Sequence, residues 1–381
     1  MSERLIIQNF GPIHQADIDL RALTIFVGPQ ATGKSLVTQI IFFLRGIEYL
    51  LASDVVPRGT SARDTVVSVL EWWLGNDLSM YLEDKTVLNL VDGDREYKIT
   101  WQGAKVSVSE ALSQRIKQAS YVGRSEQQSQ VYIPAGRSLY SFLPPHYTPS
   151  LRFVQSWPGY TKIFYETVGE LTDLLWRKQE VGQLTFFDAT REGQFLRERM
   201  ERVLKGKMRY VQNTVALEIG KKHFPATTLS AGQMETWPFW AIVEALMTST
   251  GPDFNQIYFE EPEAHLHPGA QVTVMEVVAN LIRRGTQFLI TTHSPYILYA
   301  VNNFLMAHKI LDLRQALPDS IPADSALNAT QVAAYRFSTD RKVYNVMDTE
   351  SGLIDADDLE EVANELGGNF THLQESLEKV A

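Results

Sequence analysis

Cysteine is absent from this chain of 381 residues, so disulfide bonds and thiolate zinc sites are excluded. Long hydrophobic runs are lacking as well: the most apolar stretch, residues 37–52, is short for a bilayer span and is interrupted by Arg45 and Glu48. No secretory signal is recognisable at the start of the sequence. These absences exclude a disulfide-stabilised mini-protein and a membrane protein, and we expect a cytoplasmic protein with no membrane partner.

Basic residues are also fewer than acidic ones. The chain has 35 Lys and Arg residues against 45 Asp and Glu residues, and the net charge of -10 argues against a uniformly basic nucleic-acid binder. Two local charge runs stand out, a basic one at residues 191–222 and an acidic one at residues 348–361. We interpret both first as solvated helix faces, although a basic patch for DNA stays open.

Hydrophobic patterns predict alternating strands and helices. Residues 22–27 are almost wholly apolar, which is typical of a strand buried on both faces of a parallel sheet, and a helix is expected from about residue 33 to 51. Helical spacing recurs between residues 150 and 205. Later strands at residues 256–259 and 287–291 alternate with helices, which predicts right-handed parallel crossovers.

Two hairpins are expected outside this alternation. The first joins residues 86–91 to residues 96–101, and the second joins residues 207–210 to residues 215–219. The first hairpin falls in residues 53–130, which we interpret as an insertion of helices and a small antiparallel piece.

The strongest motif is a phosphate-binding loop. Residues 28–35 read Gly-Pro-Gln-Ala-Thr-Gly-Lys-Ser and fit G-x-x-x-x-G-K-[ST] between an apolar strand and a helix. In such a loop the backbone N–H groups surround the phosphates, and the following helix directs its positive end towards them. Lys34 is expected at the β- and γ-phosphates and Ser35 at Mg²⁺. The loop residues expected at the nucleotide are Gly28, Gln30, Ala31, Thr32, Gly33, Lys34 and Ser35.

Two acidic residues and a histidine suit ATP hydrolysis. Glu260 and Glu261 end a strand that we expect to neighbour the strand before the loop. Glu260 is expected to hold Mg²⁺ through water, and Glu261 to orient and deprotonate the attacking water. His293 follows the strand at 287–291, where it can reach a γ-phosphate, although a histidine here also suits a purely structural role. Lys34, Glu261 and His293 are thus the catalytic candidates.

Three later segments resemble ABC-type ATPases, in the order that this superfamily shows. Residues 229–233 look like its LSGGQ signature, and residues 260–268 (Glu-Glu-Pro-Glu-Ala-His-Leu-His-Pro) resemble the Walker B motif and D-loop of its non-transporter branch. Residues 291–295 (Thr-Thr-His-Ser-Pro) resemble the switch histidine of that branch, and residues 9–13 and 132–137 are also typical of it. The whole set is similar to the ATPase domains of RecF, SMC and OLD (overcoming lysogenization defect) proteins. The signature residues expected at ATP are Leu229, Ser230, Ala231, Gly232 and Gln233.

This resemblance implies an α/β protein with an ABC-type P-loop ATPase fold, which has a mixed or parallel core sheet, an antiparallel β portion and a helical lobe. The core would comprise residues 1–52 and 131–310, with the helical lobe at about 150–230. Residues 53–130 would be the insertion, and residues 311–381 a C-terminal α/β extension that ends in an acidic helix.

The resemblance also implies how the protein works. ATP and Mg²⁺ would be the cofactors, and two copies would enclose two ATP molecules, with the signature of one copy facing the phosphate loop of the other. Ser230 and Gly232 would then complete the partner's site through a hydroxyl, a backbone N–H group and a helix N-terminus. ATP would hold the dimer closed, and hydrolysis would release it.

Two departures from the family pattern concern the metal and the nucleotide. Walker B usually ends in Asp-Glu, whereas this chain has Glu260-Glu261. The usual Q-loop glutamine is missing after the strand pattern at 131–133, where Arg137 stands in the segment Ala-Gly-Arg. We expect Arg137 to contact a phosphate or an acidic residue, or to form a structural salt bridge.

Three functions follow from these patterns. The chain lacks the long coiled coil of SMC proteins, and the stretch after His293 has no convincing nuclease motif of the OLD type. We expect an ATP-driven switch or sensor that controls a separate effector such as a nuclease, similar to the ATPase subunits of the anti-phage systems PARIS and Septu. The alternatives are a RecF-like DNA-repair ATPase that binds DNA, supported by residues 191–222, and a scaffold that binds ATP but hardly hydrolyses it.

Overall fold

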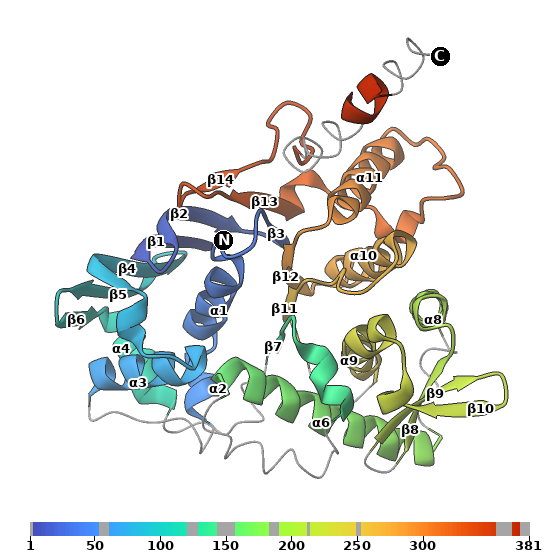
Figure 1. Cartoon of the computed structure of the whole chain (residues 1–381), viewed down its shortest axis with the longest axis horizontal. Helices are drawn as coiled ribbons and strands as arrows, with labels where there is room; N and C mark the ends of the chain where they lie inside the picture. Colours follow the sequence, from blue (N-terminus) through green and yellow to red (C-terminus); the bar gives the residue numbers. More distant parts are fainter. Residues whose placement is uncertain are drawn as a thin grey trace.

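The computed structural model describes residues 3–52, 61–119, 129–142, 157–182, 190–211, 214–248, 253–355 and 368–373. These residues form a mixed α/β structure with three sheets, so the predicted fold class is confirmed. A central sheet separates an antiparallel sheet and the first helix from a layer of longer helices (Figure 1).

The central sheet has six strands in the order β14-β13-β3-β12-β11-β7. These strands are β3 (Leu23–Val27), β7 (Gln130–Ile133), β11 (Gln256–Glu260), β12 (Gln287–Thr292), β13 (Val332–Phe337) and β14 (Val343–Asn345). Neighbouring strands are parallel, except that β14 runs antiparallel to β13. β3 is buried along its whole length, as its apolar sequence predicted, because both faces of the sheet are covered.

The strand order brings three loops to one edge of the sheet. β12 lies between β3 and β11 and is parallel to both. The carboxyl ends of these strands therefore place the phosphate loop, His293 and the acidic pair side by side. This corrects the expectation that the strand with the acidic pair directly neighbours the strand before the loop, since the strand of the histidine separates them.

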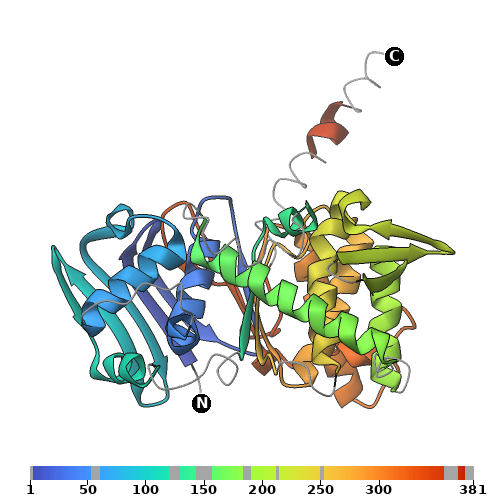
Figure 2. The ribbon, with the colours of Figure 1, turned by 90° about the horizontal axis from the view of Figure 1, so that it is seen from below.

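Helices cover both faces of the central sheet. On the face shared with the antiparallel sheet lie α1 (Lys34–Arg45), α2 (Ile47–Leu51), α3 (Ala62–Leu74) and α4 (Glu110–Gln118). On the opposite face lie α6 (Gly159–Glu180), α8 (Arg191–Leu204), α9 (Ala231–Leu246), α10 (Pro268–Arg283) and α11 (Pro295–Asp312). Ile25 and Phe26 of β3 accordingly belong to different cores, because successive side chains point to opposite faces. The long helix α6 crosses the molecule and contacts both α3 and α9 (Figure 2).

The antiparallel sheet has five strands in the order β2-β1-β4-β5-β6. They are β1 (Glu3–Phe10), β2 (Ile13–Leu20), β4 (Leu82–Asp92), β5 (Arg95–Gln102) and β6 (Lys105–Val108). β4 and β5 confirm the first predicted hairpin, and β4 pairs with β1 so that Leu90 lies opposite Leu5. Part of the expected insertion therefore completes the sheet that the first two strands begin. Residues 53–60 and 120–128 of that insertion lie outside the described residues.

A third sheet and the C-terminal tail complete the fold. β8 (Lys207–Val211) and β9 (Thr214–Ile219) confirm the second predicted hairpin, and β10 (Lys222–Pro225) adds an unpredicted strand. In the tail, β13 pairs with β3 and so extends the central sheet. Of the tail end where the acidic helix is expected, residues 368–373 are helical, and residues 356–367 and 374–381 lie outside the described residues. Among the helices that the structure describes, none combines the length and the apolar composition needed to span a membrane.

Candidate functional site

The phosphate loop connects β3 to α1 and depends on its glycines. Gly28 and Gly33 have φ angles of 136° and 99°, in the region that favours glycine. A Cβ atom on Gly28 would lie 2.3 Å from the carbonyl oxygen of Phe337, and one on Gly33 would lie 2.6 Å from a methyl carbon of Ile13. The loop is therefore packed between β13 of the tail and the turn that joins β1 to β2. Gln30 and Ala31 at its tip are exposed.

Lys34 lies inside the curve of this loop. Its Nζ atom donates hydrogen bonds to the carbonyl oxygens of Gly28 and Pro29, both at 2.7 Å. Thr32 Oγ1 donates to the same Pro29 carbonyl at 2.8 Å. Burial lowers the pKa of Lys34 to about 8, although nearby carboxylates oppose this shift. The ammonium group is thus held where phosphate oxygens could replace the two carbonyls.

Glu260 and Ser35, the residues predicted to hold Mg²⁺, are brought together. Glu260 is buried, and its carboxylate accepts hydrogen bonds from the Tyr132 hydroxyl at 2.6 Å and the Ala135 N–H group at 3.0 Å. Burial raises the pKa of this carboxyl, while hydrogen bonds from Tyr132 and Ser35 oppose the shift. A hydroxyl and a carboxylate in contact are hard oxygen ligands of the kind that Mg²⁺ prefers, so the pair fits this metal. Tyr132 was missed as a site residue, although its segment was noted as typical of the family.

Glu261 follows directly but has different surroundings. Its φ angle of 43° is uncommon for a residue with a side chain, and such conformations gather at functional sites. Its N–H group donates to the carbonyl oxygen of Thr291 at 2.9 Å, which anchors the turn to β12. Its carboxylate is part-exposed, with Oε1 3.7 Å from Nε2 of His293. The residue predicted to activate water therefore faces the histidine at the open edge of the site.

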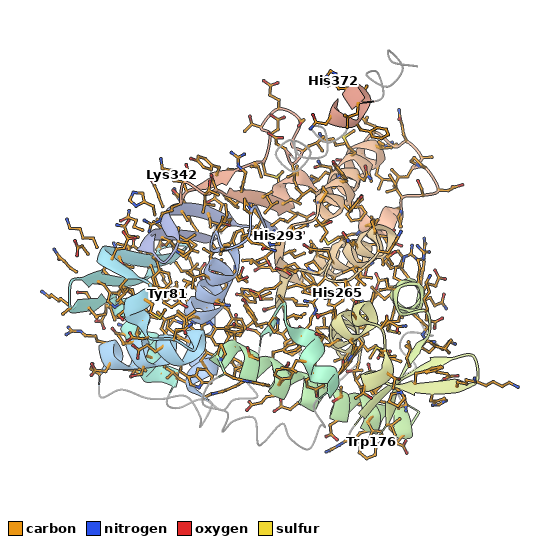
Figure 3. All side chains as sticks on the ribbon, in the orientation of Figure 1. Tyr81, Trp176, His265, His293, Lys342 and His372 are labelled. Atoms are coloured by element: carbon orange, nitrogen blue, oxygen red, sulfur yellow. The ribbon has the colours of Figure 1, made fainter. Side chains whose placement is uncertain are left out.

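His293 lies between Glu261 and the phosphate loop, near the middle of the molecule (Figure 3). Its ring is hydrogen-bonded with the backbone of Gly28, and burial together with the charge of Lys34 lowers the pKa of the ring. A neutral ring at neutral pH follows from this direction. The structure therefore unites the loop, both glutamates and the histidine, which lie far apart in the sequence.

Glu263 positions the backbone of the histidine turn. Its Oε1 atom accepts hydrogen bonds from the N–H group of His293 at 2.7 Å and from the Thr292 hydroxyl at 2.9 Å. Burial raises the pKa of Glu263, and these hydrogen bonds oppose the shift. Glu263 was missed as a site residue, although it stands within the segment that resembles the Walker B motif and D-loop.

Arg137 lies in the interior, at the start of a short 3₁₀ helix, Arg137–Phe142. Its guanidinium donates to four backbone carbonyl oxygens, those of Pro134, Glu235, Glu260 and Glu261, at 2.6–3.1 Å. It also forms an ion pair with the Glu235 carboxylate at 3.5 Å. The prediction of a phosphate contact does not fit this position, because the side chain is enclosed by protein. The structural salt bridge, the other prediction for Arg137, is present.

The signature segment forms the N-terminus of α9. Ser230 is the N-cap, and it exchanges hydrogen bonds with Gln233 in a capping box. The Gln233 amide also donates to the carbonyl oxygen of Leu204 at 2.6 Å. Leu229 is buried, whereas Ser230 and Ala231 are exposed. The structure thus gives Leu229 and Gln233 structural contacts inside the chain and leaves Ser230 and Ala231 open to a ligand.

Gly232 of the signature packs against the D-loop. A Cβ atom at this position would lie 2.6 Å from the carbonyl oxygen of His265, so a side chain would push the two segments apart. His265 has a φ angle of 56° and lies in the turn between Glu261 and His267, the N-cap of α10. The signature is therefore in direct contact with the segment that follows the acidic pair.

Comparison with protein families identifies part of this site. Residues 163–298 match the AAA ATPase domain family, and this stretch includes the signature, the acidic pair and His293. This match supports an ATP-hydrolysing enzyme. The phosphate loop lies before the matched residues. Comparison with curated protein sequences gave no match.

Comparison with solved structures gave matches at low sequence identity. The SMC head bound to the C-terminal winged-helix domain of ScpA has 12% identity and a TM-score of 0.48, with 92% of this chain and 98% of that chain covered. The SMC head domain from Thermotoga maritima has 11% identity and a TM-score of 0.41, with 91% and 98% covered. The ADP conformation of an ATP-binding cassette of an ABC transporter has 13% identity and a TM-score of 0.35, with 90% and 89% covered. The fold assignment rests on the chain's own strand order and phosphate loop.

Proposed function

We propose that this ATPase is a molecular switch in which two copies enclose two ATP molecules and hydrolysis separates them. The observation that carries the proposal is the division of the predicted site. Lys34, Glu260, Glu261 and His293 gather at one edge of the central sheet. Ser230 stands exposed on α9, and α9 and α1 pack on opposite faces of that sheet. The exposed signature is thus available to a nucleotide held by another copy.

Hydrolysis would use the residues at the sheet edge. Lys34 would leave the loop carbonyls for the β- and γ-phosphates, and Mg²⁺ held by Ser35 and Glu260 would neutralise phosphate charge. Glu261 would take a proton from water as its oxygen bonds to the γ-phosphorus and the bond to the bridging oxygen breaks, which leaves ADP and phosphate. His293, between Glu261 and the loop, would sense whether the γ-phosphate is present.

The partner copy would supply the remaining contacts. Ser230 would offer its hydroxyl, and the N-terminus of α9 its positive end, to the γ-phosphate bound by the other subunit. The capping box and the Gln233 contact to Leu204 hold this turn in place before any ligand arrives. Such an arrangement makes dimerisation depend on ATP.

The experiment for this proposal measures the mass of the protein in solution with and without ATP and Mg²⁺, alongside phosphate release. Glu261→Gln is expected to bind ATP, to hydrolyse it about 10²- to 10⁴-fold more slowly and to accumulate as a dimer. Glu48→Gln, remote from the site on α2, is a control that should hydrolyse ATP and dimerise as wild type does, although it loses the charge that pairs with Arg115. A Glu261→Gln protein that stays monomeric with ATP bound, or that hydrolyses at the wild-type rate, contradicts the proposal.

The proposal includes a separate effector, such as a nuclease, in anti-phage defence. This part rests on the resemblance of the motifs to the ATPase subunits of such systems. We expect the product of a neighbouring gene to co-purify with Glu261→Gln in ATP and not with Lys34→Ala, because only the former would hold the ATP-bound state. Equal recovery with both variants would show that the partner does not respond to the switch.

The RecF-like alternative is weaker in this structure. Within the basic run at residues 191–222, Arg199 forms an ion pair with Glu276 at 3.0 Å, and Arg209 pairs with Glu218. Part of the basic charge is therefore neutralised inside the chain. A salt-sensitive shift of DNA by the purified protein would favour this alternative, and absence of binding at low salt would exclude it.

A further inference from the structure

Arg137 stands out among the buried charged residues because it joins two functional segments. Only 1% of its surface is exposed. Two of its backbone partners are the carbonyls of Glu260 and Glu261, at 2.8 and 2.9 Å. A third is the carbonyl of Glu235 in α9, at 2.6 Å. One guanidinium thus holds both the acidic pair and the helix that begins with the signature.

The chemistry of these contacts is specific to arginine. Its planar guanidinium has five N–H donors in a fixed fork, whereas the ammonium of lysine is a single point on a flexible stem. A buried charge costs free energy unless it is paired, and the buried carboxylates of Glu235 and Glu260 help to offset that cost here. Such a residue contributes less to stability than an apolar side chain could, so its value lies in the geometry that it imposes.

The segment that Arg137 holds is under local strain. Glu261 has a positive φ angle, and three contacts fix its backbone: its N–H group donates to Thr291, and its carbonyl accepts from Arg137 and from the N–H group of Ala264. Loss of one contact would let the turn relax and move the carboxylate away from His293. The reaction depends steeply on this placement, since a shift of about 1 Å can cost about 100-fold in rate.

The contact of Arg137 with Glu235 connects it to the helix that carries the signature. Glu235 lies five residues after Ser230, in a helix whose first turn is locked by the capping box. Gly232 touches the D-loop at His265, so α9 and the segment after Glu261 have a second contact. A displacement of the α9 N-terminus therefore reaches the acidic pair through Arg137 and the D-loop together.

We infer that Arg137 is a positioning residue that couples the signature of each copy to Glu261 of the same copy. The inference rests on the proposed function, because the signature meets ATP only in the two-copy arrangement. ATP bound by the partner contacts Ser230 and displaces α9 as a rigid unit. Arg137 transmits this displacement to Glu261, whose carboxylate is then placed for the attack of water on the ATP of its own copy. Hydrolysis at one site then depends on occupancy of the other.

The experiment measures ATP turnover against ATP concentration, with ATP affinity and thermal stability, for wild type and Arg137→Lys. Wild type is expected to have a Hill coefficient above 1, towards about 2 for coupled sites. Arg137→Lys keeps the charge but loses the fork, so we expect kcat to fall about 10- to 100-fold and the Hill coefficient to approach 1. The affinity for ATP should change less than about twofold, since Arg137 touches no residue of the phosphate loop in the described structure.

A matched control separates this role from simple stabilisation. Arg199 is also buried and paired with a glutamate, Glu276, but it joins α8 to α10 away from the acidic pair. Arg199→Lys should lower thermal stability by a similar amount and leave kcat and the Hill coefficient unchanged. If Arg137→Lys loses ATP affinity and stability without a selective loss of kcat, the residue is only structural and the inference is wrong.

A second variant covers the case in which Arg137→Lys does not fold. Glu235→Gln removes the carboxylate of the ion pair and keeps the backbone carbonyl, so we expect a smaller loss of cooperativity with intact ATP binding. Unchanged cooperativity in Glu235→Gln would then overturn the inference. If the wild-type protein neither hydrolyses ATP nor dimerises with it, the proposed function itself is wrong. If the wild-type protein is cooperative and Arg137→Lys has the same kcat and Hill coefficient, only the coupling through Arg137 is wrong.

Discussion

The phosphate-loop edge and the signature turn, residues 229–233, differ in how complete they are within one chain. At the phosphate-loop edge, Lys34, Glu260 and His293 already have partners from three strands and their loops. In the signature turn, the Ser230 side chain bonds only to Gln233 among the described contacts and faces outwards. The fold thus preorganises the phosphate-loop edge within one chain, whereas the signature turn is preorganised for a ligand that the same chain does not hold.

The largest loss of activity should come from a substitution at the phosphate-loop edge. Lys34→Ala removes the ammonium that lies inside the phosphate loop, so we expect loss of ATP binding and a fall in turnover of about 10³-fold or more. Binding of a fluorescent ATP analogue and phosphate release measure these losses. Turnover that survives Lys34→Ala would place hydrolysis at another site.

A substitution in the signature turn should slow ATP turnover without weakening ATP binding. Ser230→Asp keeps a good N-cap for α9 but places a negative charge where the partner's phosphates would lie. We expect normal ATP binding and stability, no ATP-dependent dimer, and turnover about 100-fold lower. Light scattering and phosphate release test this variant. Normal turnover would show that the exposed turn does not complete a site.

A mixture of the two variants tests whether the loop and the signature of one site come from different copies. A heterodimer of Lys34→Ala and Ser230→Asp contains one site with both elements intact and one with both broken. Mixing should therefore raise turnover above that of either variant alone, because the intact loop and the intact signature come from different copies. The rate should stay well below that of wild type, since the broken site holds no ATP and the coupling through Arg137 is lost. If hydrolysis needs only one chain, mixing will leave the rates additive.

A smaller loss of turnover is expected from a substitution at Glu263, at the phosphate-loop edge. Glu263→Ala removes the oxygen that holds the N–H group of His293 and the hydroxyl of Thr292, so the histidine turn should loosen. We expect turnover to fall about 10-fold, with ATP affinity unchanged. Glu263→Gln retains an acceptor oxygen and is the matched control, which should keep most of the activity. Equal losses in both variants would assign the effect to the charge instead of the hydrogen bonds.

The residues at the phosphate-loop edge were predicted from the sequence better than the elements that surround them. The loop, the acidic pair and His293 are contiguous motifs at strand ends, so their meeting at one edge followed from parallel strand order. The pairing of β13 with β3 was not predictable, because strand patterns do not reveal partners some 300 residues apart. The interior position of Arg137 was missed for a related reason: its carbonyl partners come from three segments that only the fold brings together.

Near neutral pH the smallest effect expected at the phosphate-loop edge is a pH dependence of ATP binding, which grows only above pH 8. The pKa of Lys34 is about 8 in the free protein, below its ordinary value because of burial. Phosphates favour the charged form, so ATP binding above pH 8 requires uptake of a proton, and affinity should fall by up to about tenfold per pH unit there. Below pH 8 the lysine is already charged and affinity should level off. Lys34→Arg stays charged throughout, so titrations of both proteins from pH 7 to 10 should differ in slope; parallel slopes would mean that Lys34 is not the group that titrates.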